Sequence, residues 1–163
     1  MYFHFASDLR TNFGVLCGDF VFGEGQVRLA RLTTAARLDP TNGEIALDRG
    51  LTAIDLGTPE LAIPELLRAR RLLANVGTDI ALGNAHVLLG EPDVAVDDYL
   101  RAIRLNPGSF RAHANLAEPL VTLGRLDEAD RHLAIAAELW PGHPKLAELR
   151  DRARRARFDR EAP

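Results

Sequence analysis

The sequence has little of the residue types that mark secreted, membrane-bound or strongly charged proteins. Cys17 is the only cysteine among 163 residues, so no disulfide can form within the chain, which fits a reducing compartment. No stretch approaches the roughly 20 apolar residues of a transmembrane helix, and "MYFHFASDLR" lacks the features of a secretory signal. The formal net charge of −3 gives no strong field toward nucleic acid or anionic lipid. We therefore predict a cytoplasmic protein that binds neither nucleic acid nor membrane.

The residues of common catalytic and ligand-binding sites do not gather at informative spacings. The five histidines are scattered, and none has the spacing of a zinc site. Cys17 has no neighbouring histidine or cation that would activate its thiol. The arginines within 150–157 are interleaved with acidic residues, which favours a solvated face over a nucleic-acid patch. The sequence thus predicts no catalytic residue, no cofactor and no metal; an enzyme is the less favoured alternative.

What the sequence does contain is a repeat. Residues 89–108, "LGEPDVAVDDYLRAIRLNPG", and residues 123–142, "LGRLDEADRHLAIAAELWPG", coincide at eight of twenty positions when shifted by 34. More divergent copies begin at residues 56 and 22. A period of this length is typical of solenoids, in which each repeat packs mainly on its neighbours.

Each repeat has the pattern of two antiparallel helices. Ala95, Tyr99 and Ala102 recur at the spacing of one helix face, and a proline stands near the end of three of the four copies. Shorter helical stretches lie between the copies, at 43–56, 78–89 and 109–123. Gly50 and Gly83 fall inside these stretches, where glycine costs about 1 kcal/mol relative to alanine. We therefore predict close helix approach there, with small residues facing small residues.

These features resemble the tetratricopeptide repeat family. The third repeat carries Leu82-Gly83, Ala95, Tyr99 and Pro107 at the family's spacing, and the fourth carries Leu116-Ala117, Ala129, Leu133 and Pro141. The resemblance is strong over 43–142 and weak over 8–42. It implies one all-α domain over 1–163, an α-solenoid of stacked helix-turn-helix repeats. Its expected parts are a degenerate repeat at 8–41, repeats at 42–75, 76–108 and 109–142, and a C-terminal capping helix at 143–158.

The aromatic N-terminal segment, residues 1–22, fits this pattern least. It holds five of the seven phenylalanines. Residues 8–22 are predicted as a degenerate first helix, with a short strand as the alternative. Because large apolar patches are seldom left exposed on monomers, we expect this segment to pack on the solenoid or to form a homodimer.

The resemblance also implies a function, because family members bind peptides or protein segments in a concave groove lined by the first helix of each pair. Asn84 and Asn115 fall where members hold a partner's backbone through an amide, although both could equally be ordinary exposed residues. Ile80 and Leu47 stand where a carboxylate-binding clamp needs lysine, so binding of a chaperone tail is not expected. The projected groove residues are Glu44, Leu47, Asp48, Leu51, Ile80, Asn84, Val87, Arg111, Asn115 and Glu118.

The predicted function is therefore that of a non-catalytic protein–protein interaction module. The alternative is a self-associating, dimeric chaperone or an accessory subunit of a larger complex.

Overall fold

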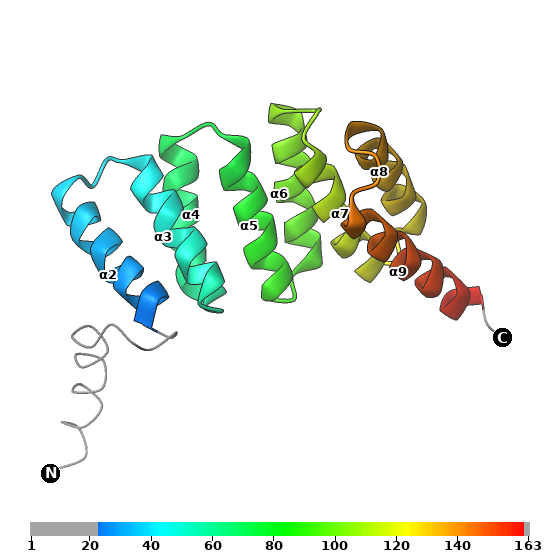
Figure 1. Ribbon diagram of the computed structural model, residues 1–163, viewed down its shortest axis with the longest axis horizontal. Helices are drawn as coiled ribbons and strands as arrows, with labels where there is room; N and C mark the ends of the chain where they lie inside the picture. Colours follow the sequence, from blue (N-terminus) through cyan, green and yellow to red (C-terminus); the bar gives the residue numbers. More distant parts are fainter. Residues whose placement is uncertain (1–22, 162–163) are drawn as a thin grey trace, which may run out of the picture.

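The computed structural model describes residues 23–161, and these residues form a row of antiparallel helical hairpins (Figure 1). The predicted all-α solenoid is confirmed. A single helix comes first and a single helix last, with three hairpins between them. In chain order the helices are α2 (Gly23–Leu38), α3 (Gly43–Asp55), α4 (Pro59–Leu72), α5 (Val76–Leu88), α6 (Pro92–Leu105), α7 (Phe110–Thr122), α8 (Leu126–Leu139) and α9 (Pro144–Glu161).

The turn inside each hairpin depends on glycine. Gly57, Gly90 and Gly124 follow α3, α5 and α7 with φ angles of +69°, +73° and +71°, a conformation that side chains with a Cβ rarely adopt. The second helix of each hairpin begins directly after this turn. Thr58, at the N-cap position of α4, makes no side-chain capping bond and instead donates its hydroxyl to the carbonyl of Ala53, 3.0 Å away.

Gly50 and Gly83 mark the close helix contacts that the sequence predicts, but the facing residues are large. A Cβ placed on Gly50 would lie 2.5 Å from Leu66, and one on Gly83 would lie 2.6 Å from the ring of Tyr99. The expectation of small residues facing small residues was therefore wrong for these two pairs. The missing side chain of one helix makes room for a leucine or tyrosine of the next, which fills the interior.

The first helices of the hairpins share one face of the solenoid. Contacts run from α3 to α5, from α5 to α7 and from α7 to α9, in addition to those within each hairpin. Helix α9 packs on α7 and α8 through Leu146, Leu149 and Ala153, which are all buried. This helix therefore continues the inner face and closes the end of the hydrophobic core.

The predictions for the N-terminal segment, helix or strand and a possible dimer contact, lie outside the described residues. Within the described part of the chain, no helix combines the length and the apolar character that crossing a bilayer requires.

Candidate functional site

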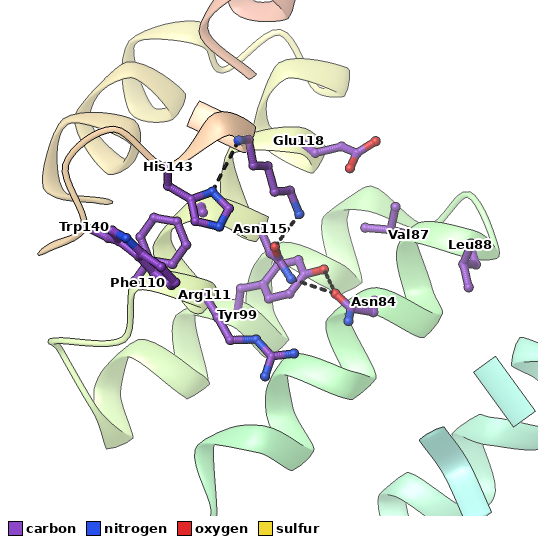
Figure 2. Close-up of a pocket in the computed structure, with 12 residues that line it drawn as sticks. Asn84, Val87, Leu88, Tyr99, Phe110, Arg111, Asn115, Glu118, Trp140 and His143 are labelled. Carbon is purple, nitrogen blue, oxygen red and sulfur yellow. Dashed lines mark hydrogen bonds between the residues drawn. The ribbon is translucent and has the colours of Figure 1, made fainter. Parts of the chain in front are cut away.

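A pocket of about 550 Å³ opens on the face shared by α5, α7 and α9 (Figure 2). Asn84 and Val87 reach it from α5, and Asn115 and Glu118 reach it from α7. Lys145 approaches from the first turn of α9. The remaining lining residues are Leu88, Tyr99, Phe110, Arg111, Ala114, Trp140 and His143.

A continuous strip of hydrogen bonds, here called the amide strip, crosses the pocket and consists of Tyr99, Asn84, Asn115 and Lys145. The hydroxyl of Tyr99 donates to Oδ1 of Asn84 at 2.7 Å, and Nδ2 of Asn115 donates to the same oxygen at 3.0 Å. Nζ of Lys145 donates to Oδ1 of Asn115 at 2.7 Å. The strip therefore links α6, α5, α7 and α9 (Figure 2).

Lys145 sets the direction of every bond in the amide strip. An ammonium group can only donate, so Asn115 must turn its oxygen toward Lys145 and its nitrogen toward Asn84. Asn84 must then present its oxygen, and the hydroxyl of Tyr99 must donate to it. Burial, with the charges of Glu118 and Asp98 as smaller causes, raises the pKa of Tyr99, so the hydroxyl keeps its proton. Both amide oxygens are thus engaged within the protein, and the strip offers N–H donors to a ligand.

The charges around the pocket favour an electron-rich ligand. Arg111 is exposed at the pocket wall, and Lys145 is partly exposed. The one carboxylate in the lining, that of Glu118, accepts a hydrogen bond from Nη1 of Arg152 at 2.6 Å. Because Glu118 already has a cationic partner, the side chains facing the pocket attract anions more than cations.

One end of the pocket is aromatic. The rings of Phe110 and Trp140 meet edge to face, with centroids 5.2 Å apart. His143 lies 4.7 Å from each of them, and its Nδ1 accepts a hydrogen bond from the backbone N–H of Lys145 at 3.3 Å. The aromatic cluster Phe110, Trp140 and His143 is therefore joined to the first turn of the helix that carries the lysine (Figure 2).

Five of the ten groove residues predicted from the sequence line this pocket, and five do not. Leu47 and Ile80 are core residues, 9% and 5% exposed, so their assignment to an open groove is corrected. Both side chains pack into the hydrophobic core and not into the pocket. Leu51 packs against the hydrophobic core around α3 and α4. The five that line the pocket are Asn84, Val87, Arg111, Asn115 and Glu118.

The other two predicted groove residues, Glu44 and Asp48, also lie outside the pocket. Glu44 is exposed in the first turn of α3. Asp48 faces Arg28 of α2 at 4.0 Å, with both side chains about half exposed. Neither residue contributes to the amide strip.

Sequence reasoning missed Lys145, although a signal was present. Asn115 follows Asn84 by 31 positions and Lys145 follows Asn115 by 30, three and four positions short of the 34-residue period. Each side chain therefore lies about one helical turn earlier on its inner helix than the one before it, on the same helix face. The groove residues predicted from the sequence end in the last full repeat, and the helix after it is predicted only as a cap. The spacing of Tyr99 predicts only a packing position on its helix and does not indicate that its hydroxyl reaches Asn84.

A second polar cluster, between α4, α5 and α6, is buried and serves the packing of repeats. Asp98 is 5% exposed; Nη1 of Arg70 lies 3.1 Å from its Oδ1, and Nδ1 of His86 lies 2.8 Å from its Oδ2. Burial raises the pKa of Asp98, and the His86 and Arg70 charges act against that rise. Asp79 is 2% exposed and lies 3.9 Å from Arg70. These contacts tie α4 to the hairpin that carries Asn84.

The fold and this pocket define a helical-repeat solenoid with a polar site on its inner face. Residues 80–144 match the family model described as tetratricopeptide repeat. The match covers less than half of the chain, and the described residues have the fold of that family. A comparison with curated proteins gives no match.

Solved structures with this fold cover most of the chain. The MamA protein is 25% identical, with a TM-score of 0.70 over 91% of this chain and 88% of its own. YrrB, described as a TPR protein with an unusual peptide-binding site, is 24% identical, with a TM-score of 0.65 over 91% and 85%. The second TPR domain of human RPAP3, in complex with the HSP70 peptide SGPTIEEVD, is 22% identical, with a TM-score of 0.65 over 69% and 98%.

Proposed function

We propose that the pocket between α5, α7 and α9 holds an extended segment of another protein, and that this segment carries at least one carboxylate. On this proposal the chain is a non-catalytic interaction module. The observation that carries it is the direction of the amide strip, which leaves N–H groups of Asn84, Asn115 and Lys145 for a ligand. Carbonyl and carboxylate oxygens are the groups that an extended peptide offers to such donors.

The charge of the pocket supports the choice of a carboxylate. Arg111 and Lys145 lie in the lining, while Glu118 is paired with Arg152. Hydrogen bonds from charged donors to carboxylates are roughly twice as strong as neutral ones. The peptide bound by the RPAP3 domain, SGPTIEEVD, is also acidic toward its end. In the present chain Ile80 and Leu47 supply no lysine, so Lys145 and Arg111 would contact the acidic residue instead.

A displayed library of random peptides, selected on the purified chain, tests the proposal. We expect Asp and Glu to be enriched in the bound pool. Isothermal titration with one selected peptide should show about fivefold weaker binding to Asn115→Ala, the effect of about 1 kcal/mol for one hydrogen bond. Lys145→Gln should also bind more weakly, and its affinity should depend less on salt because a charge contact is lost.

Matched variants outside the pocket serve as controls. Asn106→Ala removes an amide whose Oδ1 accepts only from the Gly108 backbone in an exposed turn, and Arg150→Gln removes an exposed cation of α9. Both should bind the selected peptide as the wild type does. A pool without acidic enrichment would refute the proposal. Unchanged affinity in Asn115→Ala and Lys145→Gln, at unchanged melting temperature, would refute it as well.

A further inference from the structure

Trp140 is the only tryptophan of the chain, and it lies at the edge of the pocket with 55% of its surface exposed. Its ring is positioned by its neighbours: it meets Phe110 edge to face at 5.2 Å and His143 at 4.7 Å. Large aromatic rings that are exposed but already held in place lose little conformational entropy on binding, so they often anchor a partner. The aromatic cluster has the geometry of such an anchor.

The cluster is close to the groups that we propose bind the carboxylate. His143 precedes Lys145 by two residues and accepts a hydrogen bond from its backbone N–H. Phe110 is adjacent to Arg111 at the start of α7. Figure 2 shows the three rings gathered at one end of the pocket, with Arg111 beside them. Lys145 lines the same pocket. A segment seated on the amide strip would therefore extend toward these rings.

The charges decide which kind of side chain the rings would accept. Aromatic faces attract cations as well as apolar groups. Here Arg111 and Lys145 lie in the same lining, and Glu118 is already paired with Arg152, so a further cation would be repelled. The aromatic rings and the positive charges around them therefore both favour an uncharged, bulky side chain of the bound segment.

We propose that Phe110, Trp140 and His143 form a subsite for a large aliphatic or aromatic side chain, close in sequence to the acidic residue of the bound segment. This inference rests on the proposed function and adds to it a second specificity position. The partner would thus carry a short motif that combines an apolar residue with a carboxylate.

The experiment selects random displayed peptides on the wild type and on Trp140→Ala in parallel. We expect the wild-type pool to be enriched in an apolar residue at a fixed distance from Asp or Glu. The Trp140→Ala pool should keep the acidic preference and lose the apolar one. Phe158→Ala is the matched control, because Phe158 is 73% exposed on α9 and does not line the pocket. Trp140→Phe retains an aromatic ring and should retain the preference.

A selected peptide and its version with alanine at the apolar position then complete a double-mutant cycle. Trp140→Ala should weaken binding of the selected peptide about tenfold, the range of an aromatic hot spot. It should weaken binding of the alanine version less than about twofold. Because Trp140 is the only tryptophan, its emission should shift to shorter wavelength with the first peptide and not with the second.

The two proposals fail in different ways. A wild-type pool with acidic residues and no apolar preference, or with cationic residues beside the acid, would overturn the aromatic subsite and leave the proposed function standing. Equal weakening of both peptides by Trp140→Ala would do the same. A pool with neither preference would overturn the proposed function and this inference with it.

Discussion

The contact between Gly83 and Tyr99 gives the sharpest test of how the repeats pack, because the same chain contains an alternative solution. Three atoms of the Tyr99 ring lie 2.6, 2.7 and 2.8 Å from the position of a Cβ on Gly83. Tyr99 is 2% exposed, and its hydroxyl donates to Asn84, so the ring cannot move aside freely. In the fourth repeat the corresponding pair is Ala117 and Leu133, both buried. In the fourth repeat alanine is thus accommodated opposite leucine, whereas the second repeat pairs Gly50 with Leu66.

Gly83→Ala should therefore destabilise the chain despite the better helix propensity of alanine. Overpacking a core position costs about 1–3 kcal/mol, and replacing a helical glycine returns about 1 kcal/mol. We expect a net loss of about 1 kcal/mol, which corresponds to a fall in melting temperature of about 2–4 °C for a chain of this size. Urea unfolding followed by circular dichroism measures the free energy of unfolding directly.

The double variant Gly83→Ala with Tyr99→Leu reproduces the pair of the fourth repeat and should be more stable than the sum of the single changes predicts. Tyr99→Leu alone loses the hydrogen bond to Asn84 and part of the ring packing. With leucine present, the methyl group introduced by Gly83→Ala no longer meets a ring, so the coupling free energy should be about 1 kcal/mol or more. Additivity within about 0.5 kcal/mol would show that the two positions do not compete for space and would refute this account.

Two further predictions concern ionisable groups. Burial, and then the charge of the neighbouring His113, lowers the pKa of His132 below its ordinary 6.5, so the unfolded chain takes up this proton more readily than the folded one. Stability should consequently fall as the pH decreases through 6.5 toward the lowered pKa; His132→Gln should reduce that fall in urea unfolding measured between about pH 7.5 and 5.5, and an identical fall in the variant would contradict the assignment. Arg70→Met should lower the free energy of unfolding at neutral pH by roughly 2 kcal/mol, a value reduced for the partial exposure of the arginine, because it leaves the buried Asp98 without its arginine partner. The exposed Arg71→Met on the same helix is the control, and equal losses in both variants would show that the ion pair is not the cause.

The sequence predicted the architecture well because solenoid packing is local. Turn glycines and small residues recur at fixed spacing along the copies, three of the four copies also have a helix-ending proline, and each copy needs only its neighbours to pack. Gly90 and Gly124, for example, adopt the positive φ that such turns require. The spacing of Gly83 predicts a close helix contact but does not say which side chain of the next helix faces the glycine, because that depends on the rotamer that the side chain adopts between the two helices.

The candidate site was predicted only in part, for a different physical reason. Asn84 and Asn115 follow from the predicted inner face, because residues one helical turn apart lie on the same side of a helix. Ile80 belongs to the same helix as Asn84, one turn earlier, yet packs into the core. The inner face of the solenoid is therefore narrower than the family projection assumed. Lys145 was missed since the helix that carries it had been treated as an end cap.

The polarity of the pocket then follows from a single side chain at the end of the repeat array. Without a donor-only group beside it, the amide of Asn115 could turn either face toward Asn84, and the strip could offer a ligand oxygens as readily as N–H groups. Lys145 removes that freedom through one hydrogen bond of 2.7 Å, and the constraint passes by way of Asn115 and Asn84 to the hydroxyl of Tyr99. The helix that closes the core at the C-terminal end thus also determines, three helices away, which atoms the inner face presents.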